Sequence, residues 1–205
     1  LYGRLDRIED QARALEQAAV RAPTAQAGAA MLERAADLAE RRLGDMGRAF
    51  ELARAAIEGL GPPEDVDLAA SAERLDRLDR TATAAGRFGE LYSLYEVHIA
   101  ASASVEARHG LYTRLVRVGV DSKAAPDDVL AIALSALDLL PDDAALIEPI
   151  ETLSRESGRL DELAALWRER AQAAEPGARP AWLLRAARLC HETADAAAAE
   201  SLLSQ

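Results

Sequence analysis

The sequence is poor in the residues that most often carry chemistry. It has one cysteine, Cys190, three histidines and a single lysine, Lys123, among 205 residues. A lone cysteine excludes an internal disulfide and favours a reducing compartment such as the cytoplasm. No Cys-x-x-Cys, His-Glu-x-x-His or Gly-Lys-Ser/Thr phosphate loop occurs. We therefore predict no catalytic, cofactor or metal site, and we interpret Cys190 as a buried inert thiol, with a reactive or ligating thiol as the alternative.

Long hydrophobic runs and clustered positive charge are also missing. No run reaches the ~18–20 apolar residues of a membrane span, so we expect none. The net charge is −11, and no basic stripe of the kind that binds a phosphate backbone is visible. Nucleic acid and anionic membranes are therefore unexpected partners. The chain begins at Leu1 rather than methionine, and we expect it to be a fragment of a longer protein.

Aromatic residues make up only 4% of the chain, and no strict apolar/polar alternation predicts a strand. Alanine, leucine, arginine and glutamate, which are strong helix formers, dominate instead. The sequence predicts an all-α fold of about 11 helices joined by short connections, which force antiparallel neighbours. The expected helices cover about 4–21, 25–43, 46–60, 65–85, 87–101, a stretch from Ser102 or Ser104 to 118, 126–140, 141–157, 159–174, 180–192 and 196–203.

A short motif recurs along the chain. Gly158-Arg159 is followed by an apolar residue, two mostly polar residues and another apolar residue, and the same pattern follows Gly86-Arg87 and Gly3-Arg4. Repetition at this scale in a helical pattern is typical of a solenoid, in which helix hairpins stack because none can bury its apolar face alone. We expect a single solenoid over residues 1–205, with units of about 3–86, 87–158 and 159–205.

Two of the expected helices, at about 46–60 and 126–140, carry small residues at three- and four-residue spacings and are followed by glycine or proline. Ala49, Ala53 and Ala56 precede Gly61-Pro62, and Val129, Ala133 and Ala136 precede Pro141. With the segments 32–36 (Leu-Glu-Arg-Ala-Ala) and 183–187 (Leu-Leu-Arg-Ala-Ala), this pattern resembles the degenerate tetratricopeptide repeats of bacteria. The resemblance implies a right-handed α-solenoid with a concave groove that binds peptides, helices or whole proteins.

Candidate partner-binding residues emerge when Arg87 is aligned with Arg159. This alignment matches Tyr95 with Trp167 as core positions, whereas Tyr92 falls on an alanine and His98 falls on Arg170. Tyrosine is a favoured interface anchor, and arginine forms charge-assisted bonds to carboxylates. We predict that Tyr92, His98 and Arg170 face the groove, with core packing as the alternative for Tyr92.

These observations predict a non-catalytic scaffold that binds a protein or peptide. One alternative is a self-associating spacer, in which two copies pair through the solenoid ends or through Leu202 and Leu203 of a bare terminal hairpin. Another is a regulatory domain fused to an enzyme elsewhere in a longer chain. A helical enzyme is the remaining alternative, although no constellation of titratable groups in the sequence favours it.

Overall fold

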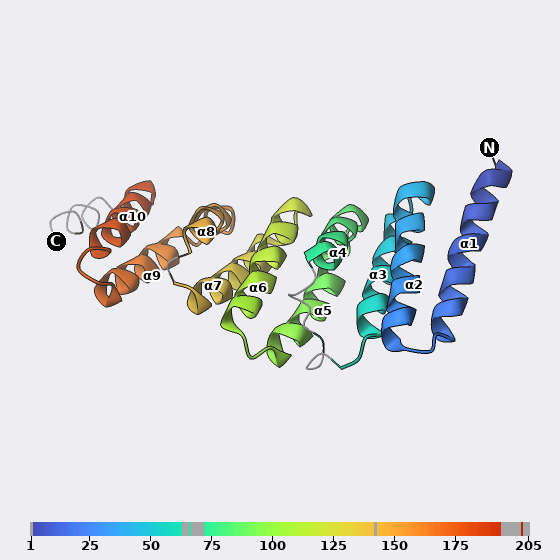
Figure 1. Cartoon of the computed structure of the whole chain (residues 1–205). Helices are drawn as coiled ribbons and strands as arrows, with labels where there is room; N and C mark the ends of the chain where they lie inside the picture. The colour runs from blue at the N-terminus through green and yellow to red at the C-terminus, as the bar shows by residue number, and fades with distance from the viewer. Residues whose placement is uncertain (1, 63–65, 67–71, 142, 194–201, 203–205) are drawn as a thin grey trace.

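Every regular secondary-structure element in the described part of the chain is a helix. The computed structural model describes residues 2–62, 66, 72–141, 143–193 and 202 (Figure 1). Helical residues make up 82% of the described residues, and the described ranges contain no strand. The helices are α1 (Tyr2–Val20), α2 (Ala25–Leu38), the π-helical turn η1 (Ala39–Leu43), α3 (Met46–Glu58), α4 (Ala72–Ala85), α5 (Phe88–Ala101), α6 (Val105–Asp121), α7 (Pro126–Leu139), α8 (Ala144–Glu156), α9 (Leu160–Ala173) and α10 (Arg179–Glu192).

The all-α prediction is confirmed, and most of the predicted helix ends hold to within a few residues. Ten of the expected helices are present in the described part of the chain. The predicted eleventh helix, 196–203, lies outside it except for Leu202, as does most of the expected start of the fourth, 65–71. No helix in the described ranges combines the length and apolarity that crossing a membrane requires.

Side-chain caps explain where several helices begin. The side chains of Thr24, Asp45, Ser104 and Asp143 each accept a hydrogen bond from a backbone N–H two or three residues later, at 2.9–3.1 Å. These bonds satisfy donors that have no partner within the helix. Of the two predicted caps for α6, Ser104 is the one used.

The recurring Gly-Arg motif has the same structure in two of its three copies. Gly86 and Gly158 end α4 and α8 with φ of 66° and 67°, the left-handed conformation that glycine adopts without a steric cost. The following Arg87 and Arg159 donate their backbone N–H to the carbonyl five residues earlier, at 2.9 and 2.8 Å. Gly3 does not share this role, because it lies inside α1. The motif therefore marks a true structural repeat only at the 72-residue spacing.

This repeat extends to the core. Leu91 and Leu163 are 0% and 3% exposed, and Tyr95 and Trp167 are both fully buried, as the alignment predicted. The Trp167 ring lies 5.1 Å from that of Trp182, in the first turn of α10. The apolar residues that the alignment matches on α5 and α9 are therefore buried in both copies.

Gly119 overturns one prediction. It was expected to start a long connector, but α6 continues through it to Asp121. A Cβ atom on Gly119 would lie 2.6 Å from a Val129 methyl carbon and 3.2 Å from the Phe88 ring. Glycine here allows α6 to approach α5 and α7 closely, rather than ending the helix.

The helices form a row rather than a rounded bundle. Each packs mainly against the helices next to it in the chain, and α1 and α10 lie at opposite ends of the row (Figure 1). The accessible surface is 11237 Å², whereas a compact monomer of 21.9 kDa exposes about 9,300 Å². The larger surface is that of an elongated molecule.

Candidate interaction surface

Arginine–carboxylate pairs connect α1 to α3, α2 to α4, α3 to α5, α4 to α6, α7 to α9 and α8 to α10, so each pair joins a helix to the helix two places further along the chain. The partners are 32 to 41 residues apart in sequence. The pairs are Arg48–Glu16 (α3–α1), Arg74–Glu33 (α4–α2), Arg54–Glu90 (α3–α5), Arg114–Asp79 (α6–α4), Arg170–Asp138 (α9–α7), Arg185–Glu151 and Arg155–Glu192 (both α10–α8), at 2.6–3.2 Å. Because the planar guanidinium offers several donors in a fixed arrangement, it suits this role better than lysine does.

The most buried of these connections centres on Asp79 of α4, which is only 4% exposed. Its carboxylate accepts hydrogen bonds from the Tyr95 hydroxyl at 2.7 Å and from Arg114 and Arg117 at 2.6 Å each. Burial, together with the neighbouring Asp79 carboxylate, raises the pKa of Tyr95 far above its usual range. This cluster fastens α4 to α5 and α6 at the middle of the row.

The sequence contains a signal for this cluster in the position of Asp79, which was not among the predicted site residues. Asp79 lies four residues after Leu75 and one after Leu78, so it falls on the apolar face of α4. A carboxylate on such a face needs partners, because an unpaired buried charge is costly. Its partners come from other helices and could not be identified from spacing alone.

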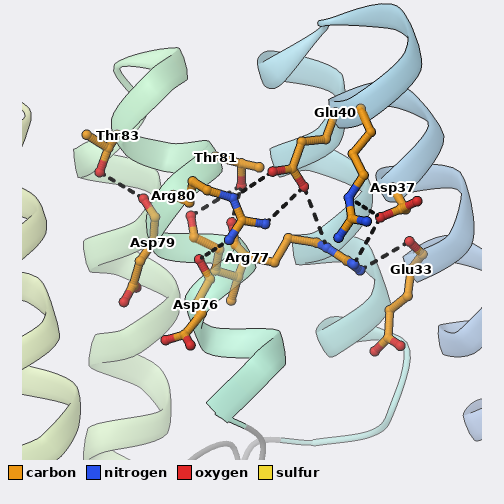
Figure 2. A network of polar contacts seen from close by, with 11 residues as sticks. Glu33, Asp37, Glu40, Asp76, Arg77, Asp79, Arg80, Thr81 and Thr83 are labelled. Atoms are coloured by element: carbon orange, nitrogen blue, oxygen red, sulfur yellow. Dashed lines mark hydrogen bonds and ion pairs between the residues drawn. The ribbon is translucent and has the colours of Figure 1, made fainter.

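A second network joins α4 to α2 and to the π-helical turn that follows it (Figure 2). Arg80 donates to both oxygens of Glu40, at 2.6 and 3.1 Å. Arg77 lies 3.8 Å from Glu40 and 3.6 Å from Asp37. The hydrogen bond from Arg80 is the main reason that the pKa of Glu40 is lowered. The network therefore holds its acids and arginines in fixed positions.

The same network borders a hollow of about 560 Å³ between α1, α2 and α4. Its lining includes the paired residues Asp37 and Arg77. Arg34 and Glu73 also line it; both are exposed, and neither makes an ion pair or side-chain hydrogen bond within the described residues. The hollow thus presents the unpaired charges of Arg34 and Glu73, whereas the other charged side chains of its lining are held in ion pairs.

The three residues predicted to face a groove do not come together. Tyr92 is half-buried against the core, and its hydroxyl lies 3.3 Å from Glu96. Burial is the main cause of its raised pKa. Tyr92 therefore fits the core-packing alternative better than the prediction of a groove-facing anchor.

Arg170 is already engaged within the protein. Its side chain is 15% exposed and pairs with Asp138 of α7 at 2.9 Å. The prediction that it offers its charge to a partner does not fit this contact, because its guanidinium connects two helices of the row. The sequence suggested an interface because Arg170 aligns with His98 and arginine forms charge-assisted bonds to carboxylates, whereas the structure uses this arginine internally.

His98 differs from the other two because it borders open space. It is 6% exposed, and its Nδ1 atom is buried without a hydrogen-bond partner among the described residues. Burial lowers the pKa of its imidazole, which favours the neutral form. It lines a second hollow, of about 510 Å³, between α3 and α5.

The remaining predicted features lie near the C-terminal end. Cys190 is buried, as expected. Leu202 is only 6% exposed, which corrects its prediction as an exposed dimer contact, and Leu203 lies outside the described residues. Within the ranges that the structure covers, no group of three or more histidine, cysteine or acidic side chains is placed to hold a metal ion.

Comparison with known proteins finds no protein family whose model matches this chain and no curated protein that resembles it.

Proposed function

We propose that this chain is a non-catalytic scaffold, built as a right-handed α-solenoid of tetratricopeptide type, that binds a protein or peptide partner. The observation that carries the proposal is the series of ion pairs, 32–41 residues apart in sequence, that join six helices to the helix two places on. This spacing is that of two-helix repeats, which are ~34 residues long in the tetratricopeptide family. Repeats that contact only their neighbours leave long surfaces open for a partner.

The hollow between α1, α2 and α4 is the surface that best suits a partner. Its unpaired Arg34 and Glu73 can form charge-assisted hydrogen bonds with groups of opposite sign. The fixed network beside it lowers the entropy that binding costs, because the lining is already ordered. A mixed-charge surface of this kind selects partners by charge pattern more than by apolar area.

The test compares the wild-type chain with a charge-reversed hollow. Both forms are immobilised and exposed to an extract of the source cell, and retained proteins are identified by mass spectrometry. We expect wild type to retain specific proteins that the variant carrying Arg34→Glu and Glu73→Lys loses, because the pattern of charge is reversed while the net charge is unchanged.

A matched control separates this surface from general charge effects. Arg188→Glu with Glu169→Lys makes the same changes near the other end of the row, and Arg188 and Glu169 make no ion pair or side-chain hydrogen bond within the described residues. The control should retain the same proteins as wild type. Identical retention by all three forms, or none by any, contradicts the proposal.

The self-associating spacer is less well supported, because Leu202 is buried rather than available to a second copy. Sedimentation velocity over a range of protein concentrations distinguishes the two: the scaffold proposal predicts a concentration-independent monomer. A regulatory role within a longer protein is compatible with the same binding surface and needs no separate site.

A further inference from the structure

We propose that the hollow between α3 and α5 binds a cationic side chain, arginine or lysine, of a protein partner. The inference deepens the proposed scaffold function by assigning the chemistry of one contact. It rests on three features of the hollow: an excess of carboxylates, an unpartnered buried histidine and an exposed apolar wall.

The carboxylates around the hollow outnumber the cations available to them. Arg54 lies 2.8 Å from Glu51, 3.1 Å from Glu90 and 3.7 Å from Glu58. Arg87 also pairs with Glu90, so two arginines serve three acids. Glu58 has the longest of these contacts and a side chain that is 57% exposed. The local excess of negative charge favours a cation and disfavours a carboxylate ligand.

His98 supplies a neutral polar group in the same hollow. Neither of its ring nitrogens makes a hydrogen bond within the described part of the chain, and Nδ1 is fully buried. A neutral imidazole has one nitrogen that accepts hydrogen bonds. Because Nδ1 has no accessible surface, an ammonium or guanidinium group entering the hollow would donate to Nε2, which accepts a hydrogen bond when the ring proton is on Nδ1.

The wall of the hollow suits the methylene stem of such a side chain. Val97 is 51% exposed although it is a large apolar residue, and it lines the hollow beside Leu94. Arginine and lysine bury their methylene groups on apolar surfaces while the charged end contacts polar groups. The volume, about 510 Å³, lies within the usual range of about 300–1,000 Å³ for small-ligand pockets.

The equivalent position in the next repeat shows how this site differs. His98 aligns with Arg170, where the chain supplies its own cation and pairs it with Asp138 of α7. At the α5 position the protein has a neutral histidine and unbalanced carboxylates instead. A partner's cation would occupy the place that the chain's own arginine occupies one repeat later.

The test uses N-acetyl-arginine amide as the probe and its citrulline counterpart, which is nearly identical in shape but uncharged. The imidazole nitrogen signals of the three histidines are followed by NMR during titration, and His98→Gln identifies the His98 signal. We expect arginine amide to shift the His98 signal with millimolar affinity and citrulline amide to shift it far less. The signals of His109 and His191 should stay unchanged.

Two variants on the acids complete the experiment. Glu58→Gln should weaken binding of arginine amide at least several-fold, whereas Glu96→Gln, on α5 but outside the hollow, should leave it unchanged. Equal responses to arginine and citrulline, no shift of His98, or no effect of Glu58→Gln overturns the inference. These outcomes are independent of the retention experiment on the α1–α2–α4 hollow, so failure here leaves the scaffold proposal standing.

Discussion

Replacing Asp79 by alanine removes the most buried of the ion pairs that connect a helix to the helix two places on. The change removes a carboxylate that is 4% exposed and accepts three hydrogen bonds. It leaves the hydroxyl of buried Tyr95 and part of the Arg114 guanidinium without their partner. The expected result is a large loss of stability located at α4, α5 and α6.

The size of the loss follows from the exposure of the partners. Removing one member of a buried ion pair costs about 3–5 kcal/mol. Arg117 is 56% exposed and Arg114 keeps a contact with Asp76, so we expect about 2–3 kcal/mol here, between the buried and exposed cases. For a protein of this size that lowers the melting temperature by roughly 5–10 °C.

The assay is urea unfolding followed by circular dichroism, with amide hydrogen exchange to locate the effect, because repeat arrays can open locally. Asp76→Ala is the matched control: Asp76 lies on the same helix and contacts the same Arg114, but it is exposed. Its replacement should cost only a small fraction of the Asp79 loss. If both variants unfold at the same urea concentration, the buried cluster does not hold the row together.

Three further predictions concern packing and protonation. Gly119→Ala should destabilise the protein by about 1–3 kcal/mol because the added methyl group overlaps its neighbours, whereas Gly110→Ala, in open space on the same helix, should stabilise it by up to about 1 kcal/mol; urea unfolding of both variants checks the opposite signs. Trp167→Ala should cost about 3–5 kcal/mol and Tyr92→Ala clearly less, because only Trp167 is fully buried; equal losses in thermal unfolding would contradict this. Burial lowers the pKa of His98, so the unfolded chain takes up a proton first and stability should fall as the pH drops below about 6.5; the stability of His98→Gln should vary less between pH 7 and pH 5.5.

The helices themselves could be predicted because their signals are local. Caps such as Thr24 and Asp45 and the stop at Gly44 lie within a few residues of the ends they determine. The core positions Tyr95 and Trp167 were also predictable, because they lie at the same distance after the two copies of the Gly-Arg motif and both are large aromatic residues. Gly119 was misassigned since glycine serves both as a helix end and as a point of close approach, and only the neighbouring helices decide between them.

The candidate surfaces were less predictable because they depend on pairs far apart in sequence. Nothing near Arg170 indicates that Asp138, 32 residues earlier, takes up its charge. The alignment of the two motif copies therefore suggested that Arg170 is free for a partner. Arg34 and Glu73 could likewise not be chosen from the sequence, because only the structure shows that no neighbouring helix in the described ranges supplies a partner for either charge.

The extended row of helices is tested most directly by small-angle X-ray scattering of the monomer in dilute solution. A compact domain of 205 residues has a radius of gyration of about 17 Å. The row predicts a clearly larger value and a distance distribution with a long tail. A radius near about 17 Å with a symmetric distribution would mean that the helices close into a globular bundle, and it would contradict the stacked arrangement.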